Sequence, residues 1–561
     1  MQRRIDLAHR ARACAAVGAS AALCAGAGRA AGAQGATVVT SGRPSDWTDA
    51  AVGSEEENYL RVLQLVGVAR PRPWSVRPFG PGELHGLVRA GVPHPWAARV
   101  AGDTVTGGDT ARSAARAPRR TIYLRTVGAA TGVAVNTGFP FSMNDGAIWT
   151  GRGPTVYASG GVAADYTPTP WARVSIRVEP LAFVASNLAV SIASNGQTGA
   201  LRYGDALEPQ RIDAPQRFGS GAYGRVDPGQ STARVDVAGL AVGVSTANQW
   251  WGPALTDPQI LGYNAAGFPH VFVGTSRPLW FGFGTVHARL LAGRLAQSAY
   301  SPMPADSAYR TASGAAAALT LDAVPGLELG GTRFYHEPWT GASHALSRIT
   351  APLGGFFGSE VANVAQNQIS SLFARWAFAP SGLEVWGEYM RNDAAADVRD
   401  LEQEPDQNSG FTVGLRKART NADGSIGAFR VEWLDDRITH LERVRGQVRP
   451  YEHTQLRQGH TQLGQVLGSD GGQGGSSVTL GYDRYVRDGR WTFEGARRVV
   501  QTSLGESAPE AAWDVLYYLR VERLRFGRRR DLMLGASAMP ELNRNFGRDA
   551  FNLRLDAGFR F

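Results

Sequence analysis

Cysteine is nearly absent from this chain. Its 561 residues contain only Cys14 and Cys24, and both lie within the first 33 positions. Those positions have the features of a leader that is removed, as described next. The mature chain is therefore predicted to lack disulfides, thiolate nucleophiles and cysteine-based metal sites.

The N-terminus has the three parts of a secretory signal. A cationic start is followed by a charge-free stretch from Ala13 to Gly28 and by Ala31-Gly-Ala33, which offers small residues for cleavage. The cationic residues are Arg3, Arg4, Arg10 and Arg12. Residues 1–33 are accordingly predicted to be a signal peptide.

Long apolar runs are also missing. No stretch of about 18 apolar residues follows the leader, so no transmembrane helix is predicted. A chain of this kind can cross a membrane only as a closed β-barrel, because lipid offers no partner for an unpaired strand edge. The 69 glycines, 14 tryptophans, 16 tyrosines and 22 phenylalanines fit many strands with aromatic girdles.

The C-terminal segment from Phe551 to Phe561 gives the clearest positive signal. Apolar side chains alternate there with Asn552, Arg554, Asp556 and other polar or small residues. Successive side chains of a strand point to opposite faces, so one face is apolar and the other polar. A soluble sandwich strand can show the same alternation. Ending on an aromatic residue favours the closing strand of an outer-membrane barrel.

The rest of the chain divides into two regions. Residues 34–118 are predicted to form a small periplasmic helical region and linker, with a capping box at Ser54 opening a helix through Gly67. Residues 119–561 are predicted to form an all-β, antiparallel transmembrane barrel of roughly sixteen to eighteen strands. Its expected strands include Arg120–Val127, Thr155–Asp165, Ala172–Phe183, Thr232–Ser245, Gly284–Leu295, Ile426–Leu434, Val478–Tyr482 and Trp491–Val499.

Enzyme signatures are missing as well. The chain has no GxSxG, no HExxH and no Walker loop, and His440, His453 and His460 are too widely spaced for a zinc set. The sequence therefore predicts a non-catalytic protein without metal or cofactor, and it gives no sign of nucleic-acid binding. A barrel hydrolase is a distant alternative.

Five inserts are too long for turns: 186–230, 247–280, 337–367, 393–409 and 436–475. Loops of this length in a compact fold are usually functional. Two segments combine aromatic rings with amide and charged groups, a pattern typical of sugar binding. Their candidate polysaccharide contacts are Asn144, Asp145, Trp149, Arg152, Asn248, Gln249, Trp250 and Trp251. An interfacial aromatic belt is the structural alternative for any single tryptophan.

A second group of charged residues follows Trp386. Its acidic residues could hold calcium, but their spacing is not that of an EF-hand loop, and pairing with arginine inside the lumen is favoured. The predicted lumen charge network comprises Glu388, Arg391, Asp397, Arg399, Asp400 and Asp406.

The motifs together resemble the Wzi-type capsule-assembly proteins of the Gram-negative outer membrane. The matching segments are Pro73–Pro78, Asn144–Gly153, Asn248–Pro253, Asn264–His270, Trp386–Tyr389, Asp397–Asp406, Thr439–Arg443 and Gly459–Gln465. Each motif is modest, but their shared order spans most of the mature chain. The last two segments add His440, His460 and Gln462 to the candidate polysaccharide contacts.

The resemblance implies an eighteen-stranded barrel with a periplasmic helical bundle and a lectin-like role in holding capsular polysaccharide on the cell surface. The expected partners are capsular or other surface polysaccharide and outer-membrane lipid, with the export machinery as a further candidate. The expected state is a monomer in the cell outer membrane. A porin-type diffusion channel is the alternative function, because polar lumen-facing residues also suit an aqueous channel.

Overall fold

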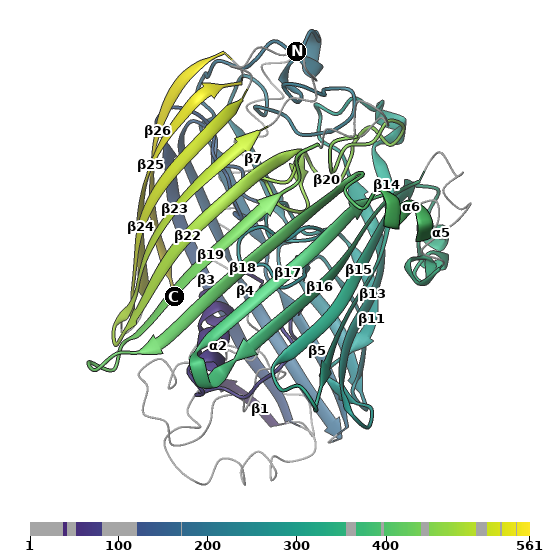
Figure 1. The fold of residues 1–561 in the computed structure, drawn as a ribbon, viewed down its shortest axis with the longest axis vertical. Coiled ribbons are helices and arrows are strands. Elements are labelled where there is room, and N and C mark those ends of the chain that lie inside the picture. Colours follow the sequence, from purple (N-terminus) through teal and green to yellow (C-terminus); the bar gives the residue numbers. More distant parts are fainter. Residues whose placement is uncertain are drawn as a thin grey trace.

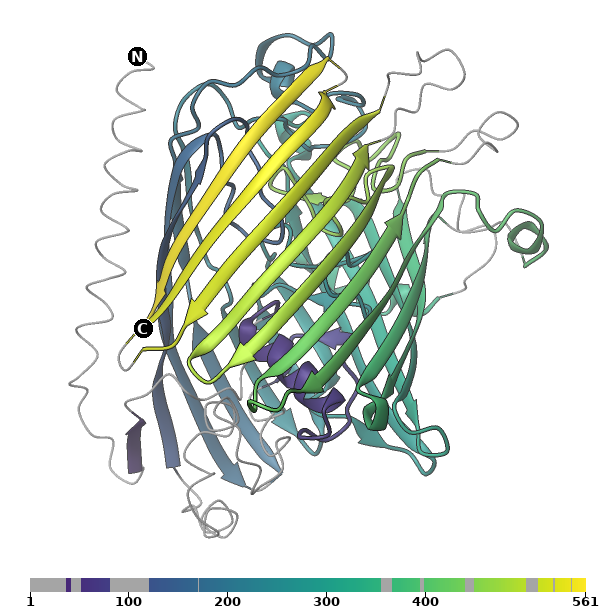
Figure 2. The same cartoon turned by 60° about the vertical axis from the view of Figure 1, so that its left-hand side comes forward.

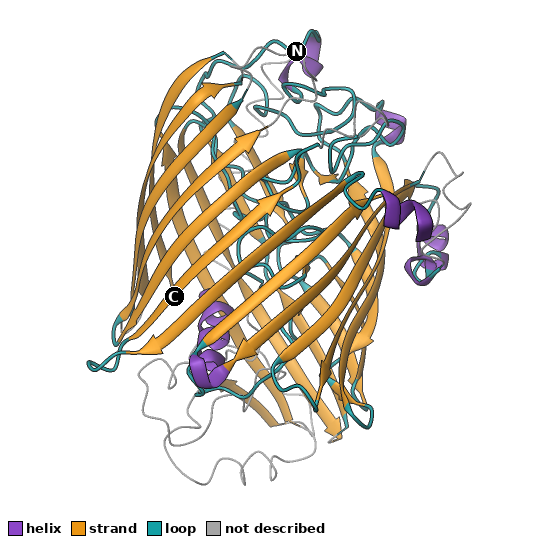
Figure 3. Ribbon diagram, in the orientation of Figure 1, coloured by secondary structure: helices purple, strands orange, loops and turns teal. Residues whose placement is uncertain are grey.

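The computed structural model describes residues 37–41, 52–80, 121–169, 171–354, 366–393, 398–438, 448–500, 513–527, 530–545 and 547–561. They form a closed antiparallel β-barrel of 18 strands, as predicted (Figures 1 and 3). The barrel closes where the last strand, β26 (Arg548–Arg560), pairs with the first, β3 (Thr121–Asn136). The signal peptide, the linker and His440 lie outside the described residues.

Long strands form most of the wall. They are β4 (Gly153–Thr169), β13 (Gly284–Ala296), β14 (Tyr309–Leu321), β15 (Leu327–Pro338), β16 (Asn367–Phe378), β17 (Leu383–Asn392), β18 (Ser409–Thr420), β19 (Ile426–Asp435), β22 (Gly475–Val486), β23 (Gly489–Val500), β24 (Asp514–Arg525) and β25 (Asp531–Arg544).

Shorter strands complete the wall between β4 and β13. They are β5 (Ala172–Val178) with β6 (Leu181–Ala185), β7 (Tyr223–Asp227) with β8 (Thr232–Val237), β9 (Leu240–Ser245), β11 (His270–Thr275) and the short β12 (Leu279–Trp280). β1 (Thr37–Ser41) pairs in parallel with β3. Two small sheets stand apart from the wall: β2 (Val76–Arg77) with β10 (Trp250–Trp251), and β20 (Thr461–Gln462) with β21 (Gln465–Val466).

Two predicted strands are interrupted. The segment 232–245 is not one strand but a hairpin, because Ala238 and Gly239 take positive φ values of 51° and 93°. Positive φ at both central residues is the geometry of a tight hairpin turn. The segment 172–183 is broken at Glu179 and Pro180, between β5 and β6. A two-residue turn, Arg487-Asp488, joins β22 to β23.

The C-terminal strand has the predicted two faces. Phe551 and Leu555 are 58% and 46% exposed, whereas Asn552 and Arg554 are 0% and 9% exposed. The exposed apolar side chains therefore face outward, toward lipid, and the polar side chains face the lumen. Among the described residues, no helix is long and apolar enough to cross a membrane.

The two ends of the barrel differ. Short turns such as Ala238–Gly239 and Arg487–Asp488 lie at one end, near the C-terminus, and long loops crowd the other end (Figures 1 and 2). Outer-membrane barrels have short periplasmic turns and long extracellular loops. The short-turn end is therefore periplasmic, and the loop end is extracellular.

The predicted helix is present as α2 (Glu55–Leu65), capped by Ser54, whose hydroxyl accepts from the Glu57 amide. It lies within the lumen near the periplasmic end (Figure 2). Its apolar side chains pack on the inner wall, including Ala418, Ile426 and Tyr485. We call residues 52–80 the N-terminal plug.

The loop 246–269, here called the inner loop, also fills the lumen. Its residues pack against inward-facing side chains of β13 to β17 in one buried apolar cluster. That cluster includes Trp251, Ile260, Leu261 and Phe268 of the inner loop, and Leu291, Phe334, Ile369 and Met390 of the wall. Two other helices, α5 (Ala342–Ser347) and α6 (Val398–Gln403), lie outside the barrel near the loop end (Figure 1).

Candidate functional site

A cavity of about 300 Å³ opens among the extracellular loops. We call it the mouth cavity. Five parts of the chain line it: the loop after β3, the loop after β6, the inner loop at Asn264, the segment 449–475 and the extracellular ends of β23 to β25. Its polar lining includes Ser142, Asp205, Gln216, Asn264, Arg449, Gln465, Asp470, Gln473, Asp514 and Asn545.

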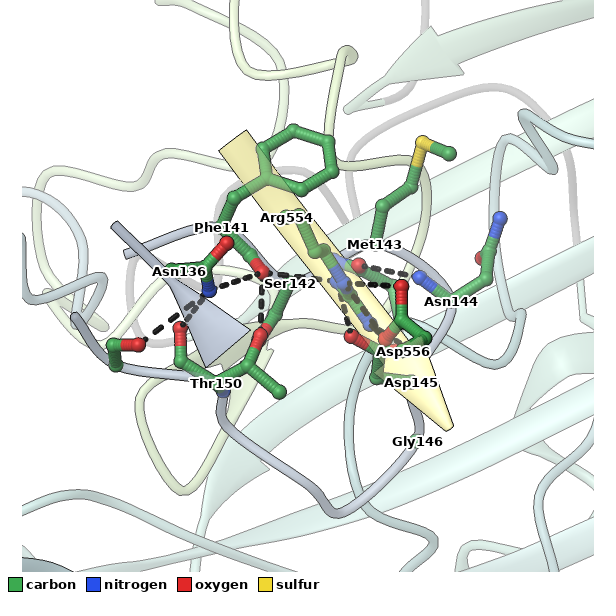
Figure 4. Close-up of polar contacts among 12 residues, drawn as sticks. Asn136, Phe141, Ser142, Met143, Asn144, Asp145, Gly146, Thr150, Arg554 and Asp556 are labelled. Carbon is green, nitrogen blue, oxygen red and sulfur yellow. Dashed lines mark hydrogen bonds and ion pairs between the residues drawn. The ribbon is translucent and has the colours of Figure 1, made fainter. Parts of the chain in front are cut away.

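The loop after β3 is fixed to the wall by charge and amide contacts (Figure 4). Arg554 on β26 forms an ion pair with Asp145, with Nη1 and Oδ2 3.0 Å apart, and a second pair with Asp556. Asn136 at the end of β3 donates through Nδ2 to the carbonyls of Thr150 and Gly151. The loop is therefore held at both ends by buried side chains of the wall.

Trp149 forms an aromatic wall of the cavity. Its ring packs edge-on against Phe218 and Tyr223, with ring centroids 5.0 and 6.0 Å apart. The residue is only 7% exposed, so a ligand can reach its edge rather than a whole face. Phe141 adds a second ring to the lining.

Ion pairs stiffen the other walls. Arg449 lies 3.6 Å from Asp205, which also accepts from Gln473 Nε2 at 3.2 Å. Arg498 on β23 meets Asp470 at 2.9 Å. Amides, carboxylates, guanidinium groups and ring edges thus converge on one space, and such a set can hydrogen-bond a polyhydroxylated ligand while packing on its apolar edges.

The predicted contacts of the first motif lie around this cavity. Trp149 lines it, whereas Asn144, Asp145 and Arg152 hold its loop. Asn144 takes a positive φ of 52° and donates to the Thr256 carbonyl at 2.9 Å. Arg152 donates to the carbonyls of Thr137 and Ala189.

The second motif lies elsewhere. Trp250 and Trp251 are 3% and 0% exposed and pair with the N-terminal plug through β2. Asn248 donates to the carbonyls of Gly262 and Ala265, and Gln249 accepts from Arg289. Trp250 contacts Arg77 of the plug, and the other three side chains fix the inner loop to itself or to the wall. None of the four lines the mouth cavity.

His460 and Gln462 are buried as well. His460 contacts His336 and the Ile260 carbonyl, and the Gln462 side chain accepts from the Ala296 amide at 2.8 Å. Both residues anchor the segment 449–475, whose outer part lines the cavity. Neither residue lines it.

The predicted charge network is not a single lumen cluster. Glu388 faces the lumen and accepts from Ser371 at 2.7 Å. Arg391, an odd number of positions away on β17, points to the opposite face and meets Asp400 at 3.7 Å. Arg399 and Asp406 lie on the segment that follows Asp393, and Asp397 is outside the described residues.

Most of the cavity lining was not singled out from the sequence. Gln216, Gln473, Asp514 and Asn545 are polar residues without a motif, far apart in the chain. The sequence shows only that these residues lie on long inserts or at strand ends. Only the closed barrel brings those loops together.

Comparison with known proteins supplies the family. The family model of capsule assembly protein Wzi matches residues 165–495, more than half of the chain. The chain belongs to this family. The resemblance found in its motifs is thereby confirmed, and the matched region includes both the 205–216 and the 449–475 walls of the mouth cavity.

One solved structure supports the fold assignment. Wzi of Escherichia coli, described as an outer-membrane, carbohydrate-binding β-barrel involved in group 1 capsule assembly, matches with a TM-score of 0.60 and 14% identity, over 91% of this chain and 98% of that chain. OccK5 of Pseudomonas aeruginosa (TM-score 0.37, 10% identity, 78% and 98% covered) and OccAB2 of Acinetobacter baumannii (0.40, 8%, 78% and 98%) match less well and add no argument. No curated protein matches the sequence.

This Wzi-family chain is an outer-membrane barrel. Its lumen is crossed by the N-terminal plug and the inner loop, and the polar mouth cavity opens at the extracellular end.

Proposed function

We propose that this protein binds capsular or related surface polysaccharide at the mouth cavity, and thereby helps to assemble or retain it on the cell, without turnover. One observation carries the proposal: amides, carboxylates and ring edges from five separate parts of the chain converge on a cavity at the extracellular end. The family assignment supports the same role, and the E. coli structure is described as carbohydrate-binding.

The filled lumen favours this function over a porin. A barrel of this size has room for an aqueous channel unless something occupies it. Here α2 packs on the inner wall near the periplasmic end. The inner loop packs on the inner wall closer to the extracellular end. We therefore expect the purified protein to show no stable conductance in planar bilayers, and stable open steps would favour the channel.

Binding is tested by filling the cavity. Ala206 lines it, so Ala206→Trp should reduce affinity for polysaccharide extracted from the source bacterium by about tenfold or more. Ala189→Trp is the matched control, because Ala189 is exposed on the same loop and does not line the cavity. Equal affinity in both variants would show that the binding site lies elsewhere.

Retention is tested in cells. Deleting the gene should leave the total amount of polysaccharide unchanged and shift it from the cell pellet into the medium. The Ala206→Trp gene should restore less of the pellet fraction than the Ala189→Trp gene. An unchanged partition between pellet and medium would show that the protein does not retain polysaccharide on the cell.

A further inference from the structure

The barrel wall is unusually short at one sector. β9 and β11 have 6 residues each and pair over 6 positions, whereas the neighbouring β13 has 13 residues and β4 has 17. A strand rises about 3.3 Å per residue, so six residues extend only about 20 Å, and roughly 9–11 tilted residues are needed to cross the bilayer core. The wall therefore has a notch on its extracellular side.

A recess of about 600 Å³ lies on the outer face of this notch. This volume is in the range of small-molecule sites. Its lining is mostly apolar, and Ile176, Val178 and Val244 are each about half exposed on the membrane-facing side. Small residues of β13, Ala292 and Gly293, form part of its lining and leave it hollow.

The helix α5 covers one side of the recess with Ala342, Ala345 and Leu346. It is tied to the wall at a fixed position. Glu337 on β15 accepts from Arg348 Nε at 2.9 Å and lies 3.3 Å from His344. Because this ion pair sets the place of α5, the recess is preformed rather than induced.

A cation stands at the extracellular edge of the recess. Arg294 is exposed, lines the recess and lies close to the end of β13. Its guanidinium carbon is 4.4 Å from the centroid of the Tyr309 ring and 5.8 Å from that of Trp339. Arginine with tyrosine and tryptophan is the set expected at the level of lipid headgroups, and a guanidinium group binds phosphate in a bidentate manner.

We propose that this recess binds one lipid of the outer leaflet, with an acyl chain against Val244 and Val271 and a phosphate at Arg294. The apolar, membrane-facing lining suits a chain, and the exposed cation supplies the charge complementarity. The bound lipid would complete the hydrophobic surface where the wall is short, and would hold the extracellular loops at a fixed depth in the membrane.

The test uses the full protein in lipid nanodiscs with native mass spectrometry. Lipid A should remain bound at one molecule per barrel after the remaining lipid is removed, and diacylglycerol, which has no phosphate, should not. Val244→Trp and Arg294→Gln should each lower that occupancy by about tenfold. A heat-dependent shift in gel mobility verifies that each variant has folded.

Two matched variants separate this site from general solvation by lipid. Val242 is 57% exposed on the same strand but does not line the recess, and Arg525 is a cation at the periplasmic end. Val242→Trp and Arg525→Gln should retain the lipid as the unmodified protein does. Equal loss in all four variants, equal retention of diacylglycerol, or a dimer that Val244→Trp dissociates would each overturn the proposal.

Discussion

Arg61 on α2 lies 3.1 Å from Glu384 on β17, and both side chains are almost completely buried. Glu384 also meets Arg375 at 2.6 Å and Arg416 at 2.5 Å. A single carboxylate thus joins the helix inside the barrel to three neighbouring strands. Because three guanidinium groups converge on it, the negative charge at this position fixes the N-terminal plug in the lumen.

Glu384→Gln should loosen the plug. The substitution keeps the size of the side chain but leaves buried Arg61 and Arg416 without their counter-charge, and leaves Arg375 with Glu328 alone. Removing one partner of a buried pair costs roughly 3–5 kcal/mol. We expect a lower unfolding midpoint in detergent. We also expect intermittent conductance in planar bilayers, where the unmodified protein should show none.

The control is the ion pair between Arg484 and Asp423 at the periplasmic end. Its side chains are 47% and 52% exposed, so Asp423→Asn should lower the unfolding midpoint far less than Glu384→Gln and open no conductance. Similar behaviour of the two variants would contradict the role given to Glu384.

The sequence predicted those parts of the fold that depend on neighbouring residues. Alternation from Phe551 to Phe561 identified a lipid-facing strand, and the capping box at Ser54 identified a helix. Ala238 at positive φ gave no signal, because alanine rarely takes that conformation, so one strand was predicted where a hairpin stands.

The candidate site depended on long-range packing. Trp250 and Trp251 were chosen for their rings, but no local pattern says whether an insert turns outward or into the lumen. The inner loop turns inward because the barrel is wide enough to accept it and its apolar residues then bury against Phe334 and Met390. The same closure places Trp149 in the lining of one cavity with Gln473, more than 300 positions away.

Trp251 is expected to stabilise the barrel rather than to bind sugar. Its ring is fully buried and packs against Phe334, with centroids 6.2 Å apart. Trp251→Ala should cost roughly 3–5 kcal/mol, since a large cavity replaces the ring. Trp171→Ala is the control, because Trp171 is 62% exposed. Unfolding midpoints should separate the two variants. A folded Trp251→Ala protein that loses polysaccharide affinity without losing stability would contradict this assignment.

Asp145 is expected to control the mouth cavity through its loop. Asp145→Asn removes the charge opposite Arg554, which keeps Asp556 as a partner, so the cost should be modest, about 1 kcal/mol. The loop carrying Trp149 should exchange its amide hydrogens faster, and polysaccharide affinity should fall severalfold. Asp549→Asn, at the exposed start of β26, serves as the control. Unchanged exchange in the loop would show that Arg554 does not hold it.

Acid should loosen the segment that carries His460. The Nε2 atom of His460 lies 2.6 Å from the Ile260 carbonyl and must donate a proton to it. In a neutral ring Nδ1 then carries no proton, and it accepts from His336 Nε2 at 2.8 Å. Burial lowers the pKa of His460 to about 3, aided by the positive charge of Arg310, while the bond to Ile260 opposes the shift. The neutral form is thus the one that the fold accommodates.

The sign of the pH effect follows from that lowered pKa. Between about pH 6.5 and 3 the unfolded chain binds a proton at His460 and the folded chain does not, so stability falls as the pH falls through this window. At pH 5 the loss from this group is about 2 kcal/mol. Unfolding followed by tryptophan fluorescence at pH 7.5 and pH 5 should show it, and His460→Gln should reduce the difference. His344→Gln, at a half-exposed position on α5, should leave the difference unchanged, and an equal pH dependence in all three proteins would assign the effect to other groups.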